Sequence, residues 1–412
     1  MSSGRGTQRE EFRQLNVLIG VAFVDMIGFM LVLPVLPFYA LRMHATPTQV
    51  GWILAAFSIA QLVSAPLWGR VSDRYGRRPA LLIGLSAAAL AYIVFAFANS
   101  LLLLFVSRLV QGAGGGTTGV AQAYVADTVR PADRARALGW LSSASSAGVI
   151  VGPILGTFAG HLGTAAPGLI AAGLCILNAL FAWRWLPESR HEPEPGAVRA
   201  RRPIWAPAVH TFLHPDAPVS RLIWIYGTGM LAFAALTGVL PIYLNAEFGV
   251  NERTFGYFLT YFGALSLVMR ILLLGPIVDR LGERGTMRLG CVALILGLLL
   301  YPAAHNIWVL AIVVMPLVPI GTALLFPSTT ALISGQVSRA ELGVTMGVAQ
   351  TFAGVARSIG PVASNRAFQS LGHGWPFYLA ATLIGFVTLL AMRVAPRSDV
   401  PDTPTGETAI PT

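Results

Sequence analysis

The sequence predicts an all-α polytopic membrane protein in which twelve transmembrane helices form two pseudo-symmetric six-helix bundles. The first observation is the composition: 55% of the 412 residues are hydrophobic, 11% are charged, and the mean hydropathy is +0.67. A soluble chain of this size cannot bury so much apolar surface, so a bilayer must solvate part of it. The other two observations are a series of twelve apolar runs and an internal repeat of half the chain length.

Twelve apolar runs are long enough to cross a bilayer, which takes roughly 20 helical residues. They lie near residues 15–41, 50–70, 79–98, 100–123, 136–160, 168–186, 219–244, 254–278, 286–304, 307–334, 341–368 and 375–394. A polar stretch rich in Pro, Arg and His separates the first six from the last six. We therefore expect four regions: an N-terminal bundle (1–186), a cytoplasmic linker (187–218), a C-terminal bundle (219–394) and a disordered, Pro/Thr-rich cytoplasmic tail (395–412).

A short basic loop between two apolar runs occurs twice. Gly69–Pro79 reads GRVSDRYGRRP, and Gly275–Arg284 reads GPIVDRLGER. Asp73 and Asp279 of the two copies are 206 residues apart, which is half of the chain. Repeated helical bundles of one design are a signature of secondary transporters. A generic positive loop with a glycine turn is the alternative interpretation, but it does not account for the half-chain spacing.

The distribution of arginines predicts the topology. All 28 basic residues are arginines, and most of them gather in the loops on one side of the predicted spans. The opposite loops hold only Arg42, Arg253 and Arg366. By the positive-inside rule, both termini face the cytoplasm, and the chain is a multi-pass protein of the inner (plasma) membrane. The formal charge of +10 therefore reflects membrane topology and indicates no nucleic-acid partner.

The sequence contains no constellation typical of an enzyme. Its seven histidines are scattered, and Cys175 and Cys291 lie inside apolar runs, so no disulfide framework is expected. The glycine-rich stretch at 112–116 opens no helix after a strand, and the chain has no lysine, which excludes a nucleotide-binding loop. We expect no enzymatic activity, no cofactor and no metal site.

Four ionisable residues, Asp25, Arg108, Arg270 and Arg357, lie inside predicted spans. Each is a candidate functional residue, because such groups cost several kcal/mol to keep in a membrane. Asp25 stands ten residues into the first run, about 15 Å along a helix and near the midplane. The structural alternatives are a hydrogen bond between helices for Asp25 and pairing with backbone carbonyls for Arg108. Three arginines against one aspartate favour an anionic, zwitterionic or metal-chelated substrate over a simple cation.

Two runs carry a polar or small face at helical spacing, and such a face must line water or another helix. In the fourth run it consists of Arg108, Gln111, Gly115, Thr118 and Gln122; in the eleventh it consists of Gln350, Gly354, Arg357, Pro361 and Ser364.

The fifth run reads GVIVGPILGT over Gly148–Thr157. Small residues at Gly148, Gly152 and Gly156 let two helices approach closely, and Pro153 predicts a kink. The Gly-Pro pair recurs at Gly360–Pro361 in the eleventh run.

These motifs resemble those of a known family. The repeated loop resembles the signature loop of the major facilitator superfamily. The first-run stretch IGFMLVLPVLP, the RxxQG of the fourth run and the GxxxGPxxG of the fifth resemble the motif set of the twelve-helix drug–proton antiporters, in particular the tetracycline exporters. The resemblance covers about the first 160 residues closely and the second half loosely. Thr157 stands where the family pattern prefers glycine.

The resemblance implies a proton-coupled antiporter that exports drug-like small molecules by alternating access. Its expected partners are a small-molecule substrate, protons and the lipid bilayer, and it is expected to be a monomer. Two alternatives stay open: an exporter or importer of an anionic or zwitterionic metabolite, and a non-transporting membrane sensor on the same fold.

The site residues follow from the polar stripes together with this resemblance. Proton coupling is assigned to Asp25 and Arg108, and helix packing with the antiporter motif to Gly148, Gly152, Pro153 and Gly156. The substrate cavity is expected to hold Asp25, Phe29, Arg108, Gln111, Gln350 and Arg357. The cytoplasmic gate is expected to hold Gly69, Asp73, Arg74, Gly76, Arg77, Arg78, Asp127, Asp279, Arg280, Gly282 and Arg284, with Asp127 bridging Arg77.

Overall fold

The computed structural model describes residues 3–130, 132–189 and 206–394, and every regular element in these ranges is a helix. The predicted tail (395–412) and most of the predicted linker lie outside the described residues. The first half contains α1 (Ser3–Val32), α2 (Leu36–Arg42), α3 (Pro47–Tyr75), α4 (Arg77–Ala96), α5 (Leu101–Gly114), α6 (Thr117–Thr128), α7 (Arg134–His161) and α8 (Ala166–Trp185). The second half contains α9 (Ala206–Leu213), α10 (Pro218–Phe248), α11 (Phe255–Leu272), α12 (Leu274–Leu300), α13 (Ile307–Val309), the π-helical turn η1 (Leu310–Val314), α14 (Leu317–Ser334), α15 (Arg339–Leu371) and α16 (Trp375–Met392).

All twelve predicted runs are helical, which confirms the predicted fold class. Within the described ranges, nine helical segments are long and apolar enough to cross a membrane by length and composition. The remaining three runs differ for identifiable reasons. One is divided between α5 and α6, each too short to span alone, whereas α12 and α15 include charged residues along their length.

Two helix breaks coincide with residues that disfavour a helix. The chain leaves α1 at Leu33 and enters α2 at Leu36, next to Pro34 and Pro37, which lack the backbone donors that a continuous helix needs. The other break, at Gly115 and Gly116, lies beside Trp68 of α3. A Cβ atom at Gly116 would collide with this indole, whose Nε1 donates to the Ala113 carbonyl at 2.5 Å.

Glycines set how closely the helices pack within each bundle. On α7, a Cβ atom added to Gly148 would lie 2.8 Å from the Phe23 carbonyl oxygen of α1, and one added to Gly156 would collide with the carbonyl of Leu31. Pro153 lies inside α7, which continues through it as one helix to His161. In the second half, Gly360 of α15 packs in the same way against α10, where an added Cβ would lie 2.8 Å from the backbone nitrogen of Ala235.

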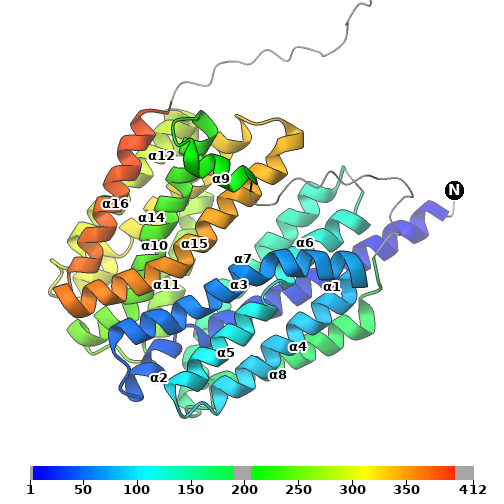
Figure 1. Cartoon of the computed structure of the whole chain (residues 1–412), viewed down its shortest axis with the longest axis horizontal. Helices are drawn as coiled ribbons and strands as arrows, with labels where there is room; N and C mark the ends of the chain where they lie inside the picture. The colour runs from blue at the N-terminus through cyan, green and yellow to red at the C-terminus, as the bar shows by residue number, and fades with distance from the viewer. Residues whose placement is uncertain (1–2, 131, 190–205, 395–412) are drawn as a thin grey trace, which may run out of the picture.

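The two bundles meet at one end and separate towards the other (Figure 1). Buried side chains of both bundles form one hydrophobic cluster, which contains Leu36, Phe38, Val239 and Phe255 at the joined end and continues along the C-terminal bundle to Ala391. At the opposite end, the N-terminal bundle has a second cluster of its own, built from α1, α4, α6, α7 and α8. Thus the apolar core is shared only where the bundles touch.

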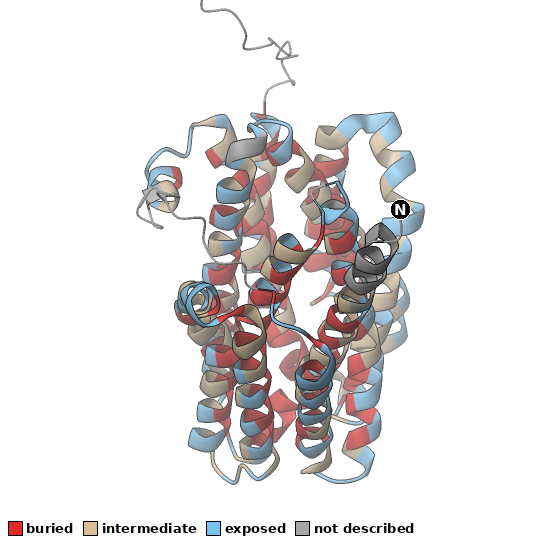
Figure 2. Cartoon of the chain, turned by 90° about the vertical axis from the view of Figure 1, so that its right-hand side faces the viewer, coloured by how far each residue is buried: buried red, intermediate tan, exposed pale blue. Residues whose placement is uncertain are grey.

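The outer surface is apolar in the way that a bilayer requires. Exposed and intermediate residues cover the outward faces of the helices, and buried residues lie between them (Figure 2). Large apolar side chains are among the most exposed, including Leu102, Phe158 and Trp308 at 70%, 68% and 71% of their full accessibility. Such a surface is stable when lipid covers it.

Candidate functional site

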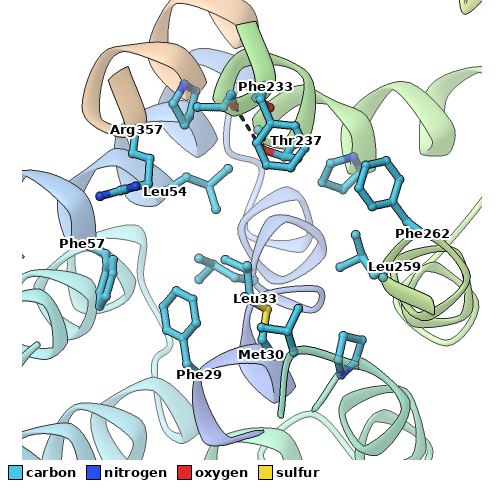
Figure 3. Close-up of a pocket in the computed structure, with 18 of the residues that line it drawn as sticks. Phe29, Met30, Leu33, Leu54, Phe57, Phe233, Thr237, Leu259, Phe262 and Arg357 are labelled. Atoms are coloured by element: carbon cyan, nitrogen blue, oxygen red, sulfur yellow. Dashed lines mark hydrogen bonds between the residues drawn. The ribbon is translucent and has the colours of Figure 1, made fainter. Parts of the chain in front are cut away.

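A cavity of about 530 Å³ lies between the two bundles. α1, α2, α3, α5 and α7 contribute one side, and α10, α11 and α15 contribute the other (Figure 3). The lining is largely apolar and contains Phe29 and Phe57, whose rings are 4.8 Å apart, and Phe233 and Phe262, whose rings are 6.2 Å apart. A cavity of this volume is in the range that accommodates drug-sized molecules.

The charged residues of the cavity lining are all arginines. Arg108 comes from α5, Arg270 from α11 and Arg357 from α15, and no Asp or Glu among the described residues lines this cavity. Arg108 is 1% exposed, and its guanidinium carbon lies 5.6 Å from the centre of the Phe95 ring. All three of its guanidinium nitrogens are buried without a hydrogen-bond partner among the described residues. Arg357 reaches from α15 into the cavity near Leu54 (Figure 3).

Asp25 lies on α1 behind this lining. Its carboxylate accepts a hydrogen bond from the Thr117 hydroxyl of α6 at 3.1 Å. Nearby, the Gln111 amide donates to the Tyr92 hydroxyl, and both side chains are buried. The structure therefore contains a polar layer inside the N-terminal bundle, next to the cavity wall that Arg108 helps to form.

The cavity lining includes three of the six predicted cavity residues, Phe29, Arg108 and Arg357. Asp25 and Gln111 are directed towards α6 and α4, because the polar face of a helix in a bundle also faces its neighbours. Gln350 lies about two turns from Arg357 on α15, where its amide donates to the Tyr226 hydroxyl at 3.3 Å. These three residues thus lie outside the lining.

The first copy of the repeated loop forms a network of charged hydrogen bonds. Arg77 donates from Nη1 to Asp73 at 2.7 Å and from Nε to Asp127 at 2.8 Å. Gly76 has φ +110°, a conformation that strains residues with a side chain, and is the N-cap residue that precedes α4. Glu188 accepts from the backbone nitrogens of Arg77 and Arg78 at 2.8 and 3.2 Å and thereby caps α4. Glu188 has no local motif that would reveal this role, because it lies 111 residues from Arg77.

The second copy is less connected. Gly282 has φ +68°, and its carbonyl accepts a hydrogen bond from the Thr286 hydroxyl at 2.8 Å. Asp279 and Arg280 are exposed, and neither they nor Arg284 form an ion pair within the described part of the chain.

At the joined end, side chains from the two bundles contact each other directly. Arg42 forms an ion pair with Glu252, and the Thr48 hydroxyl donates to Gln369 at 2.7 Å. A Cβ atom at Gly51 would lie 2.7 Å from the Pro361 carbonyl oxygen. Gly256 of α11 packs directly on the Thr157 hydroxyl of α7, so the residue that departs from the glycine pattern lies at the contact between bundles. The pairs Arg42–Glu252 and Thr48–Gln369 were not predicted, because the partners are distant in the sequence.

Two helical bundles that share a membrane-sized apolar surface and enclose a cavity between them define a membrane carrier. Comparison with known proteins specifies the family. The profile of the Major Facilitator Superfamily matches residues 18–246 and 222–410, so the chain belongs to this superfamily.

Several relatives match the chain over most of its length. The class G tetracycline resistance protein of Vibrio anguillarum is 31% identical, with 87% of this chain and 92% of that protein covered. The class B tetracycline resistance protein of Escherichia coli is 28% identical, covering 92% and 94%. Multidrug resistance protein 2 of Bacillus subtilis (strain 168) is 26% identical, covering 91% and 92%. The chain is therefore a secondary active transporter homologous to tetracycline and multidrug resistance proteins.

Solved structures support the same fold. The nucleoside transporter NupG matches with a TM-score of 0.70 at 15% identity, covering 92% of this chain and 98% of that one. The human organic anion transporter MFSD10 (TETRAN) matches with a TM-score of 0.68 at 22% identity, covering 92% and 99%.

Proposed function

We propose that this chain is a proton-coupled antiporter that exports drug-like small molecules by alternating access. The observation that carries the proposal is the cavity, because both bundles line it and they are joined at only one of its ends. A substrate that enters from the separated end is held between two bodies whose rocking exposes it to the other side. The homology to tetracycline and multidrug resistance proteins supports drugs as the cargo.

Two sets of contacts are proposed to alternate during this cycle. In the conformation described above, the outer contacts Arg42–Glu252, Thr48–Gln369 and Thr157–Gly256 are closed. We propose that the two loops with the repeated motif close the cytoplasmic end when the outer contacts open. The Arg77 network holds the N-terminal loop in one shape, which prepares it for docking on the other bundle.

Proton coupling is proposed for Asp25, with Arg108 as its partner through the cavity wall. Burial favours the neutral form of a carboxyl group, whereas a neighbouring guanidinium favours the charged form. A movement that changes the separation of the two groups therefore changes whether Asp25 holds a proton. Substrate at Arg108 and proton at Asp25 then influence each other, which produces exchange.

The proposed topology places both termini and the linker (187–218) in the cytoplasm of a cell with this protein in its plasma membrane, as a monomer. The exposed residues Gln336 and Thr164 test it, since they lie in loops at opposite ends of the helices. A cysteine at Gln336 is expected to react with an impermeant maleimide only in inside-out vesicles, and a cysteine at Thr164 only in intact cells. Cys175 and Cys291 are buried and provide little background. Reversed labelling contradicts the orientation.

The function itself is tested in inside-out vesicles with an acidic interior. We expect the proton gradient to drive uptake of at least one compound from a panel that includes tetracycline and aromatic cations and anions. Collapse of the gradient by an ionophore is expected to abolish accumulation. Binding of a panel compound without gradient-driven uptake contradicts the proposal and favours a non-transporting sensor.

A further inference from the structure

We infer that the cavity selects amphiphilic organic anions, whose charged group binds Arg108 and Arg357 while the aromatic body lies against the phenylalanines. This inference rests on the proposed transport function and specifies its substrate class. It does not depend on the direction of transport or on proton coupling.

Arg108 provides the strongest part of the argument. A guanidinium is charged at any physiological pH, and burying it without an acceptor is costly. Yet this side chain is 1% exposed, lines the cavity, and has no hydrogen-bond partner for Nε, Nη1 or Nη2 among the described residues. A bound carboxylate or sulfonate supplies two acceptor oxygens in the geometry that a guanidinium fork prefers. The guanidinium lies behind the cavity wall, over the Phe95 ring, so an anion that reaches it from the cavity satisfies a group for which the described residues supply no acceptor.

Arg357 and Arg270 extend the positive charge across the cavity to the second bundle. Arg357 is of intermediate burial and Arg270 is exposed, and neither has an ion-pair partner within the described ranges. Low-dielectric walls lined by charges of one sign concentrate ligands of the opposite sign. The three arginines thus differ in solvent accessibility, from the exposed Arg270 through the intermediate Arg357 to the buried Arg108.

Among the described residues, the cavity has no acid to neutralise this charge or to receive a cation. No Asp or Glu of these residues lines it, and the partly buried Asp25 lies behind the lining, where it accepts a hydrogen bond from Thr117. A cationic drug in this cavity meets three positive charges, so binding of a cation is disfavoured. Phe29, Phe57, Phe233 and Phe262 supply apolar contacts for the rest of the molecule, which explains why an organic anion fits better than an inorganic one.

Three probes with one fluorophore isolate the effect of charge. They are 5-dimethylaminonaphthalene-1-sulfonate (anionic), its sulfonamide (neutral), and the sulfonamide that carries a 2-(trimethylammonio)ethyl group (cationic). Binding to the full-length protein in nanodiscs of zwitterionic lipid is measured by fluorescence, with empty nanodiscs as the background. We expect the anion to bind at least about tenfold more tightly than the neutral probe, because hydrogen bonds to a charged group are strong. The cation is expected to bind most weakly.

Matched variants locate the effect. Arg357→Gln is expected to weaken anion binding by roughly tenfold and to leave binding of the neutral probe within about twofold. Arg366→Gln removes the same charge from the exposed outer part of the same helix, outside the cavity, and is expected to change neither. Arg108→Gln is expected to weaken anion binding further. If that variant does not fold, Arg357→Gln alone still decides the matter.

Equal binding of anion and neutral probe, or tighter binding of the cation, overturns the inference. So does an anion affinity that Arg357→Gln leaves unchanged. Because no gradient is needed for these measurements, the outcome is independent of the transport test. Gradient-driven uptake of a cation without anion binding overturns only the substrate class, whereas anion binding without any gradient-driven uptake overturns only the antiport function.

Discussion

The N-terminal bundle contains a fully buried charged side chain, whereas the charged side chains of the C-terminal bundle that line the cavity are more accessible. Between α1, α4, α5 and α6 lie Asp25, Tyr92, Arg108 and Gln111, and Arg108 is fully buried. The buried polar side chains of the C-terminal bundle are hydroxyls and one amide, and its two cavity arginines are more accessible. Both bundles nevertheless pack through glycines in the same pattern, at Gly152 of α7 and Gly360 of α15. The comparison teaches that the repeat maintains helix packing, while the buried guanidinium of Arg108 has no equally buried counterpart among the described residues of the second half.

The two repeated loops also differ, in whether their charged side chains form ion pairs. Arg77 of the first loop pairs with two aspartates, whereas Asp279 and Arg280 of the second loop are exposed without an ion pair in the described residues. One loop is therefore held in shape by its own bundle, and the other has charges available for a different conformation.

The substitution with the largest expected effect tests whether proton coupling depends on the N-terminal bundle alone. Asp25→Asn keeps the size of the side chain and its hydrogen bond with Thr117 but removes the titrating group. We expect gradient-driven uptake to fall to the level of vesicles without the protein, while counterflow of substrate without a gradient persists. Uptake assays in inside-out vesicles measure both.

The acid chosen for comparison in the C-terminal half is Glu247, which is exposed and pairs with His373 at 2.5 Å. Glu247→Gln is expected to leave gradient-driven uptake nearly unchanged. If Glu247→Gln abolishes uptake and Asp25→Asn does not, the division of chemistry between the bundles is the reverse of the one proposed.

Helix packing is expected to be equally sensitive in both bundles. Gly156→Ala places a methyl group against the Leu31 carbonyl of α1, and Gly360→Ala places one 2.8 Å from the Ala234 Cβ atom of α10. Overpacking of this kind costs about 1–3 kcal/mol, so the midpoint of thermal unfolding in detergent should fall for both. Gly160→Ala, also on α7, places its methyl group where no atom lies within 4 Å, so this variant should leave the midpoint of thermal unfolding unchanged. A drop for Gly160→Ala as large as that for Gly156→Ala contradicts the packing argument.

The two loops should respond differently to loss of their aspartate. Asp73→Asn removes one partner of Arg77 and is expected to slow uptake roughly fivefold, since a partly exposed ion pair contributes about 1 kcal/mol. Asp279→Asn has no ion pair to break in this conformation and is expected to slow uptake less than about twofold. Protein amount in the vesicles and binding of substrate serve as controls. Normal uptake by Asp73→Asn excludes the gate role of the N-terminal loop.

The smallest effect is expected at the outer contact between the bundles. Glu252→Gln breaks an accessible ion pair with Arg42, and such pairs contribute about 1 kcal/mol or less. The readout is the rate at which an impermeant maleimide added outside labels a cysteine at the cavity residue Ser58. We expect an increase of less than about fivefold. Arg253→Gln, an exposed neighbour without that contact, is the control, and an equal increase there shows that the ion pair does not hold the outer end closed.

Much of the fold was predictable because the bilayer imposes simple requirements on the sequence. The thickness of the apolar layer fixes the length of each run, and the cost of charge in lipid confines most arginines to the ends of the runs and the segments between them. The repeat of the Asp73 loop at Asp279 indicated two bundles, and the spacing of Gly148, Gly152 and Gly156 indicated a close helix contact. Each of these patterns is recognisable in the sequence without knowledge of which helices pack together.

What faces the cavity was decided only by the tertiary structure. A polar stripe on a membrane helix indicates that the face avoids lipid, but a neighbouring helix satisfies this requirement as well as a cavity does. The rotation and packing of α1 and α5 therefore direct Asp25 and Gln111 into the bundle and leave Arg108 at the cavity. The pairs Arg42–Glu252 and Thr48–Gln369 join residues 210 and 321 positions apart, and only the docking of two separate bundles brings them together.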